Sequence, residues 1–250
     1  MKKTIIVVLG FVVAVGYAVS YGEAPSGAEI LERIDSNYRS KTRISTATMV
    51  ITERRGARTV KSRSWGRGLD SALTQYLYPP REKDTKMLKL GDELWIWSPS
   101  TDRIIKISGH MLRQSMMGSD VSYEDFMEDP KLANTYDVKV SGEEKVNGRP
   151  CYVLALTAKK DKTPAYYSRN VWVDREHYLG LKEELYAKSG KLLKKITIDE
   201  IFKVGNRWYP KQITFKDMLR SGDGTRIIIE AIEFDVDIPD YMFTKASLKR

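Results

Sequence analysis

Residues 90–99 read Leu90-Gly91-Asp92-Glu93-Leu94-Trp95-Ile96-Trp97-Ser98-Pro99, and this stretch decides the class of fold. Gly91-Asp92 is a tight turn between two strands, and Pro99 ends the second strand. In that strand Leu94 and Ile96 point to one face and Trp95 and Trp97 to the other, because successive side chains of a strand alternate. A sheet with one face in water would alternate apolar and polar residues instead. The stretch therefore predicts a sheet that is covered on both faces.

The same two-residue period continues outward along most of the chain. Residues 151–156 and 227–229 are again apolar on both faces, and short turns such as Asn147-Gly148 separate the strands. Short turns between neighbouring strands favour an antiparallel meander. We expect about ten to twelve strands, which predicts a mainly β (α+β) protein with one large antiparallel sheet curled into an incomplete barrel. The predicted strands are 44–52, 59–67, 73–78, 87–90, 93–98, 103–107, 136–146, 150–158, 170–173, 179–187, 192–202, 207–215 and 226–236.

Helical patterns interrupt the strands at three places. Ser26 and Glu29 have the spacing of a capping box, which begins a helix that we expect to run from 27 to about 40. Between 110 and 133, Ser122 and Asp125 can cap a short helix that carries Phe126 and Met127. Residues 241–243 predict a short helical plug at the end. The first two pieces are small covers for so large a sheet, which predicts an apolar hollow between sheet and cover.

The cover at 110–128 is rich in methionine. Met111, Met116, Met117 and Met127 are long and unbranched, so they can repack around ligands of variable shape. Two interpretations stay open: a mobile lid hinged at Gly118, or a permanent plug in which methionine fills gaps in the core.

The N-terminus predicts export. Lys2 and Lys3 precede an uncharged apolar stretch, and small residues at 18 and 20 predict cleavage before Tyr21. An uncleaved membrane anchor is the alternative, but the stretch is shorter than the ~20 residues that span a bilayer comfortably. Residues 1–20 are thus expected to be a signal peptide and 21–250 a single exported domain. The lone cysteine, Cys151, lies far from this site, so neither a lipid anchor there nor an internal disulfide is expected.

Charge and motifs argue against nucleic-acid binding and catalysis. Loss of Lys2 and Lys3 lowers the formal net charge from +9 to +7, and for an exported protein acidic lipid headgroups are better counterparts than nucleic acid. His110 and His177 lie in no metal-binding spacing. The adjacent pairs Glu143-Glu144 and Glu183-Glu184 point to opposite faces of their strands. We therefore expect no catalytic residues, no metal site and no cofactor.

The chain resembles the periplasmic lipoprotein-sorting carriers of the LolA/LolB-like fold, and most closely an uncharacterised LolA-like subgroup. The resemblance rests on the export signal with its single helix, on residues 90–99, on residues 116–126 and on residues 238–243. It implies an open β-barrel of about eleven strands whose apolar cavity, lidded by helices, holds acyl chains. The carriers also have an arginine directly before a proline on an early strand; here 64–68 contain Arg67 but no proline, so that role is not assigned.

The function implied is a periplasmic carrier or chaperone that binds lipidated proteins or lipids for transfer between inner and outer membrane. Its partners would be acyl chains of lipoproteins or phospholipids, an inner-membrane transporter and an outer-membrane acceptor. A periplasmic sensor of mislocalised envelope lipids or proteins is the alternative, and an accessory subunit of an envelope transporter is a third hypothesis. Arg54, Arg55 and Arg67 are candidates for headgroup or partner contact, or are simply solvated charges on edge strands. The candidate cavity and lid residues are Trp95, Trp97, Met111, Leu112, Met116, Met117, Phe126 and Met127.

Overall fold

The computed structural model describes residues 24–53 and 56–250. The signal peptide expected at 1–20, and Arg54 and Arg55, lie outside the described residues.

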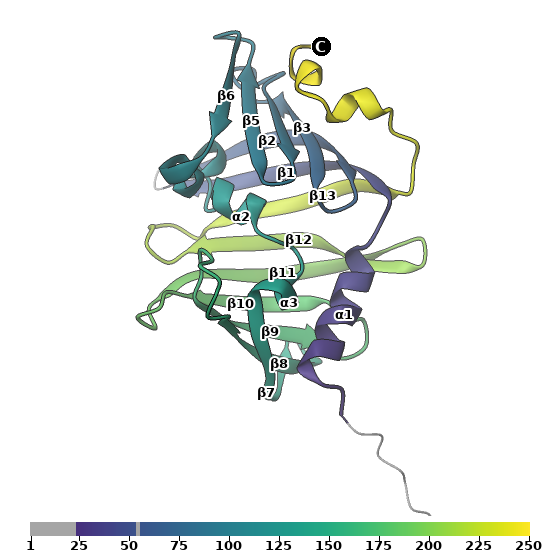
Figure 1. The fold of residues 1–250 in the computed structure, drawn as a ribbon, viewed down its shortest axis with the longest axis vertical. Coiled ribbons are helices and arrows are strands. Elements are labelled where there is room, and N and C mark those ends of the chain that lie inside the picture. Colours follow the sequence, from purple (N-terminus) through teal and green to yellow (C-terminus); the bar gives the residue numbers. More distant parts are fainter. Residues whose placement is uncertain (1–23, 54–55) are drawn as a thin grey trace, which may run out of the picture.

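Thirteen strands within the described residues form a single antiparallel sheet that is not closed into a barrel (Figure 1). Each of the thirteen predicted ranges overlaps one strand, so the alternation located the strands correctly, and their number exceeds the eleven that the resemblance implies. The strands are β1 Thr42–Glu53, β2 Gly56–Arg67, β3 Ser71–Tyr78, β4 Lys86–Leu90, β5 Glu93–Ser98, β6 Arg103–Ile107, β7 Tyr136–Val146, β8 Arg149–Ala158, β9 Ser168–Asp174, β10 Gly180–Tyr186, β11 Leu192–Val204, β12 Arg207–Asp217 and β13 Thr225–Phe234.

Two meanders make up the sheet. The strand order is β6-β5-β4-β3-β2-β1-β13-β12-β11-β10-β9-β8-β7. The meanders β1–β6 and β7–β13 join where β1 pairs with β13, with Met49 opposite Ile227. As a result β6 and β7, which follow each other in the chain, form opposite edges of the sheet. Residues 108–135, which we name the crossing segment, connect these two edges.

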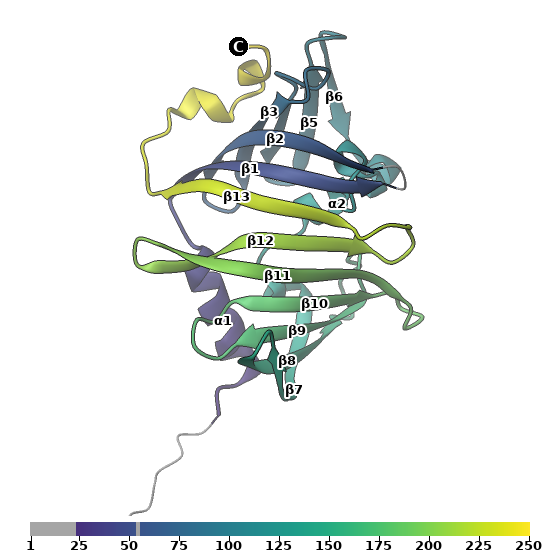
Figure 2. The same cartoon turned by 180° about the vertical axis from the view of Figure 1, so that it is seen from behind.

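The crossing segment contains four short helices. They are the 3-10 helices η1 Gly109–Arg113 and η2 Met116–Gly118 and the α-helices α2 Tyr123–Met127 and α3 Leu132–Thr135. The longer helix α1, Gly27–Tyr38, and the crossing segment lie over the same face of the sheet, named here the inner face (Figure 1). Figure 2 shows the other, outer face, where no helix lies in front of strands β9 to β13. Two further 3-10 helices, η3 Asp240–Phe243 and η4 Lys245–Lys249, end the chain.

Local sequence signals explain where the helices begin. The hydroxyl of Ser26 accepts from the Glu29 amide at 3.3 Å, and the Glu29 carboxylate accepts from the Ser26 amide at 2.8 Å. The predicted capping box is thus confirmed, and α1 ends two residues before the expected position. Ser122 and Asp125 form the second capping box in the same way and begin α2.

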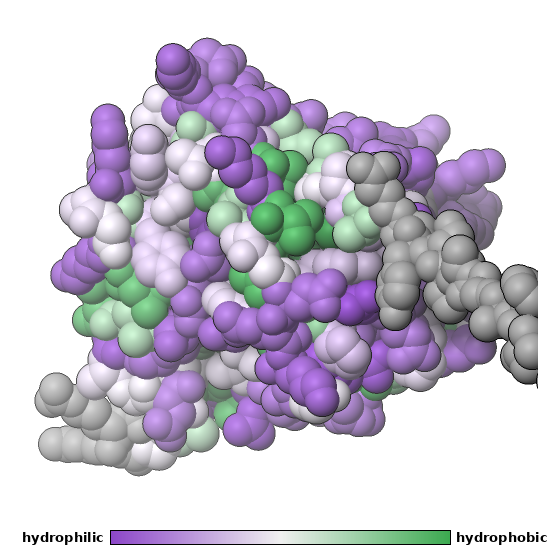
Figure 3. Space-filling view, turned by 90° about the horizontal axis from the view of Figure 1, so that it is seen from below, coloured by the Kyte–Doolittle hydropathy of each residue, from purple (hydrophilic) through white to green (hydrophobic). Residues whose placement is uncertain are grey.

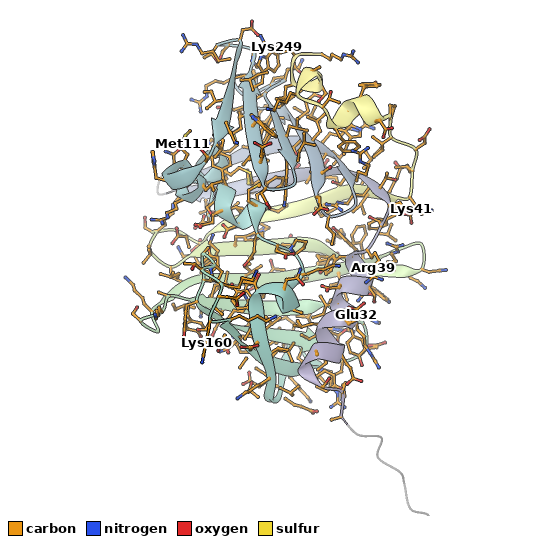
Figure 4. All side chains as sticks on the ribbon, in the orientation of Figure 1. Glu32, Arg39, Lys41, Met111, Lys160 and Lys249 are labelled. Atoms are coloured by element: carbon orange, nitrogen blue, oxygen red, sulfur yellow. The ribbon has the colours of Figure 1, made fainter. Side chains whose placement is uncertain are left out.

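Helix α1 packs its apolar side on one half of the inner face. Ile30 is 0% exposed and Leu31 is 2% exposed, and both pack against Leu154, Leu156 and Val171. The exposed side of α1 carries Glu32 and Arg39, which are labelled in Figure 4 and form an ion pair of 3.0 Å. The helix is therefore fixed by burial of aliphatic side chains rather than by its surface charges.

No helix in the described part of the chain is long and apolar enough to cross a bilayer.

We expect Ile30→Ala to lower the free energy of unfolding by about 2–5 kcal/mol, because it leaves a cavity between α1 and the sheet. Urea denaturation followed by circular dichroism measures this change. Glu32→Ala on the exposed side of the same helix is the control and should change stability by less than about 1 kcal/mol. Equal effects of both substitutions would show that α1 is not held by packing.

Candidate functional site

The inner face beneath the crossing segment is apolar. Met87, Leu94 and Ile107, on β4 to β6, form one buried cluster. Met49, Ile51, Val60 and Tyr76 form a second, on β1 to β3. The crossing segment covers the second cluster with Met117. It covers the first with Met111, Leu112, Met116, Tyr123, Phe126 and Met127.

The cover packs directly on both apolar clusters. The methionine, tyrosine and phenylalanine side chains of the crossing segment occupy the space over both clusters, although each of them stays only half-buried. Two open depressions flank α2, one of about 290 Å³ lined by Glu124, Met127 and Lys162, the other of about 360 Å³ lined by Lys89, Met127 and Asp129. Both are partly lined by charged side chains. In this structure the segment packs on the sheet, and the apolar hollow between them stays a prediction.

Asp125 ties α2 to the middle of the sheet. Its carboxylate forms an ion pair with Lys194 of β11, whose side chain is 6% exposed. It also accepts from the Tyr166 hydroxyl at 2.6 Å and from the Ser122 amide at 2.7 Å. Burial alone would raise the pKa of Asp125, but Lys194 and these hydrogen bonds together hold it below its usual range. The carboxylate is therefore charged and paired at neutral pH.

Glu128, at the end of α2, meets a second buried cation. Arg169 of β9 is 3% exposed and forms ion pairs with Glu128 and, at 3.3 Å, with Glu183 of β10. Arg169 also donates to the Tyr136 hydroxyl at 3.0 Å. One guanidinium thus serves two carboxylates. Burial, together with the neighbouring Glu183, raises the pKa of Glu128 above its usual range despite the attraction of Arg169.

Polar contacts hold residues 117–120 in place through their backbone carbonyls and through the Asp120 carboxylate. Asp120 is 6% exposed; it accepts from the Thr225 hydroxyl at 2.8 Å and from the Asp217 amide at 3.1 Å. Arg58 donates to the Met117 carbonyl, and Arg220 donates to the Gly118 carbonyl at 2.9 Å. Gly118 has a φ of +70°, which favours glycine, and an added Cβ would lie 2.9 Å from Arg58. The segment is therefore anchored to β2, β12 and β13 as well as to β9 and β11.

A family model described as an uncharacterised protein matches residues 68–250. The chain belongs to this family. No curated protein matches it.

Three solved structures share the fold. A DUF1329 family protein from Desulfovibrio piger has 27% sequence identity and a TM-score of 0.81, over 89% of this chain and 97% of that one. A domain assigned to outer membrane lipoprotein-sorting proteins, from Vibrio parahaemolyticus, has 24% identity and a TM-score of 0.78, over 90% and 98%. A LolA superfamily protein from Nitrosomonas europaea has 23% identity and a TM-score of 0.73, over 90% and 100%. The family therefore has the LolA-like fold, and the resemblance is confirmed.

In this LolA-like chain the predicted site residues fall into two groups. Met111, Leu112, Met116, Phe126 and Met127 come together on one cluster of the inner face, and Met117 lies on the neighbouring cluster. Trp95 and Trp97 lie on the opposite side of β5 from Leu94 and Ile96. There they pack with Leu248 and Met242 of the C-terminal segment. The two tryptophans are therefore not brought to the crossing segment.

Arg67 is engaged by the C-terminal segment as well. Its guanidinium forms an ion pair of 2.6 Å with Asp240 and lies 4.6 Å from the centroid of the Phe243 ring. The short helical plug predicted at 241–243 is confirmed, with Phe243 buried.

The polar residues that bind the crossing segment were missed from the sequence. Arg169 lies on the same side of its strand as Val171 and Val173, and Lys194 lies on the same side as Ile196 and Ile198. Each is a single cation at a position where the two-residue pattern expects an apolar side chain. Because a charged residue is buried only when it is paired, this pattern could have indicated a buried ion pair. The prediction that Glu183 and Glu184 face opposite ways is confirmed, because Glu183 meets Arg169 while Glu184 pairs with Lys182 at 3.0 Å.

We expect Asp125→Asn to destabilise the closed position of α2 by about 3–5 kcal/mol, because it leaves the Lys194 ammonium buried without a counterion. Hydrogen exchange of the amides in 116–127 measures this loss. Glu200→Gln, which breaks the exposed pair with Lys211, is the control and should cost less than about 1 kcal/mol. Adding Lys194→Met to Asp125→Asn should restore part of the protection; no restoration would contradict the pairing.

The pH dependence of closure follows from Glu128. A raised pKa in the closed state means that this state binds the proton more tightly than an open state with an ordinary pKa. Protection of α2 amides, corrected for intrinsic exchange, should therefore rise as pH falls from neutral through the raised pKa of Glu128. It should fall again at lower pH, where Asp125, with its lowered pKa, is protonated. Glu128→Gln should abolish the rise and keep the fall, and a steady fall from neutral pH in the unsubstituted protein would contradict the assignment.

Proposed function

We propose that the protein is a periplasmic carrier or chaperone that binds an acyl chain of a lipid or lipidated protein between the crossing segment and the inner face. The proposal rests on how the crossing segment is attached to the sheet. Its methionine and aromatic side chains lie half-buried on two apolar clusters, while buried ion pairs and hydrogen bonds fix its position. Such a cover can leave the sheet as a unit and return to one defined place.

The energies of the two occupants are comparable. About ten methylenes of an acyl chain gain roughly 8 kcal/mol on leaving water. The displaced cover gives up the burial of seven apolar side chains, each worth about 1–2 kcal/mol when half-buried. The net gain is therefore small, and cargo that binds by displacing the cover can also be released.

Methionine suits both occupancies. Its unbranched thioether side chain repacks with little strain, so Met111, Met116, Met117 and Met127 can contact either the sheet or an acyl chain. A β-branched residue would hold one rotamer and fit one of the two arrangements.

The proposed class of cargo comes from the description of a structural relative. The domain from Vibrio parahaemolyticus is described as lipoprotein-sorting, and we extend this class of cargo, or phospholipid, to the present chain as part of the proposal. An inner-membrane donor and an outer-membrane acceptor are the partners that transfer would need. The proposal includes no catalytic step.

The test is reversible locking of the crossing segment. In a Cys151→Ala background, Met117→Cys with Val60→Cys joins the segment to the cluster on which Met117 packs. Uptake of a fluorescent fatty acid should be lost on oxidation and return on reduction. Thr197→Cys with Thr214→Cys, which joins neighbouring positions of β11 and β12, is the control and should leave uptake unchanged in both states.

Two results would reject the proposal. Unchanged uptake in the oxidised Met117→Cys/Val60→Cys protein rejects the moving cover. The carrier itself is rejected if the unsubstituted protein takes up no probe and if native mass spectrometry of protein isolated from the periplasm finds no bound acyl species. Transfer of the probe to acceptor vesicles distinguishes a carrier from a sensor, which would bind the probe and retain it.

A further inference from the structure

Three loops project together from one end of the sheet. They are 159–167 between β8 and β9, 187–191 between β10 and β11, and 218–224 between β12 and β13. Connections of alternate antiparallel hairpins lie at the same end, and these loops lie at the left in Figure 1 and at the right in Figure 2. Backbone hydrogen bonds link them to their neighbours: Met218 to Leu193 at 2.9 Å, and Tyr167 to Tyr186 at 2.9 Å.

The turn at 218–224 exposes two large apolar side chains. Leu219 is 62% exposed, the highest value among the described large apolar residues, and Met218 is 40% exposed. Figure 3 shows hydrophobic residues gathered among hydrophilic ones at the left end of the molecule. Consecutive exposed aliphatic residues at the tip of a turn contribute nothing to the core, so their position calls for an apolar environment outside the protein.

The turn is rigid. The Leu219 amide donates to the Asp217 carboxylate at 2.8 Å, and the Lys216 ammonium donates to the Arg220 carbonyl at 2.5 Å. Gly224 has a φ of +96°, and an added Cβ would lie 2.3 Å from the Phe215 carbonyl oxygen. The two apolar side chains are therefore held out by a braced turn rather than by a loose loop.

Lysines follow this apolar tip along one side of it, in the next two loops of the sheet. The loops 159–163 and 187–191 contain five lysines and one aspartate. Lys160, labelled in Figure 4, and Lys162, Lys188 and Lys191 are exposed, and none has a carboxylate within 4.0 Å in the described part of the chain. Some lysines elsewhere on the surface are paired, such as Lys211 with Glu200 at 2.8 Å and Lys249 with Asp102 at 2.8 Å, and others, such as Lys203, stand apart from such a cluster. This end therefore carries uncompensated positive charge.

We propose that this end of the sheet docks on an anionic phospholipid surface. Met218 and Leu219 enter the boundary between headgroups and acyl chains, and the lysines of the two neighbouring loops meet the phosphates. Membrane-surface proteins combine a small apolar insertion with basic residues in this way, and each basic residue near an anionic leaflet strengthens binding several-fold. Two apolar side chains without a lipid anchor give reversible binding.

The docking end is also the end at which the crossing segment is held. Arg220 follows Leu219 directly, and its guanidinium donates to the Ser115 hydroxyl at 3.0 Å and to the Gly118 carbonyl at 2.9 Å. Contact of the turn with a membrane therefore takes place next to η2, which carries Met116 and Met117 of the cover. Docking itself needs no cargo, so this inference stands apart from the proposed carrier function.

Vesicle co-sedimentation tests the inference. The protein should bind vesicles of equal parts phosphatidylcholine and phosphatidylglycerol at least about tenfold more tightly than phosphatidylcholine alone, and lose binding at high salt. Lys188→Gln with Lys191→Gln should weaken binding about tenfold, whereas Lys203→Gln with Lys211→Gln, toward the opposite end of β11 and β12, should change it less than twofold. Leu219→Ser should weaken binding several-fold, and Ile104→Ser, an exposed aliphatic residue of β6, should not.

Three results would overturn it: no binding to the anionic vesicles, equal binding to both kinds of vesicle, or equal effects of the loop variants and their controls. Loss of an acidic protein partner in the lysine variant, without any vesicle binding, would assign the surface to protein instead. Uptake of the fluorescent fatty acid in solution should be unchanged by Leu219→Ser. Vesicle binding without any probe uptake would reject the carrier function and leave the docking surface in place.

Discussion

The pairing of β1 with β13 governs the rest of the structure. It joins two meanders into one sheet and places β6 and β7 at opposite edges, although they are consecutive in the chain. The chain must then travel across the sheet between residues 107 and 136. Because the inner face is apolar, a connection that crosses it is stabilised by contributing apolar side chains of its own. The methionine-rich cover is thus a consequence of topology as much as of composition.

Apolar and polar contacts have different tasks in this cover. Burial of half-exposed methionine and aromatic side chains holds the segment to the sheet without selecting one position, since methionine adapts to many. The pairs Asp125–Lys194 and Glu128–Arg169 select the position, because a buried ion that loses its partner is strongly unfavourable. A cover of this kind is either fully seated or detached, because an intermediate position would leave Lys194 buried without Asp125 and Arg169 with Glu183 as its one carboxylate.

Local rules predicted the strands and the two capping boxes because each depends on a few neighbouring residues. Alternation also placed Leu94 and Ile96 correctly on the side of β5 opposite to Trp95 and Trp97. It could not tell which side the crossing segment covers, because that depends on how β3 to β6 curl and on where η4 docks. For this reason the sequence predicts that the two tryptophans line the cavity, whereas in the structure they pack with Leu248. Glu128 and Asp125, which pair with Arg169 and Lys194, are distant from them in sequence, so these roles needed the structure.

Arg220 links the turn that displays Leu219 to the crossing segment. Its backbone belongs to the turn that displays Leu219, and its side chain binds the backbone of the crossing segment at Gly118. If this turn moves, the Arg220 guanidinium is no longer placed to donate to the backbone of 117–120. The contacts of Asp120 with Thr225 and Asp217 depend on the same hairpin of β12 and β13. The hairpin is thus shared between the surface that meets a membrane and the cover of the apolar face. If docking shifts the hairpin, the first contacts of the cover to weaken are those of Arg220 and Asp120, while the ion pairs of α2 with β9 and β11 remain. Opening would then begin at η2 and proceed toward α2, so that cargo is exposed first at the end of the sheet that faces the lipid.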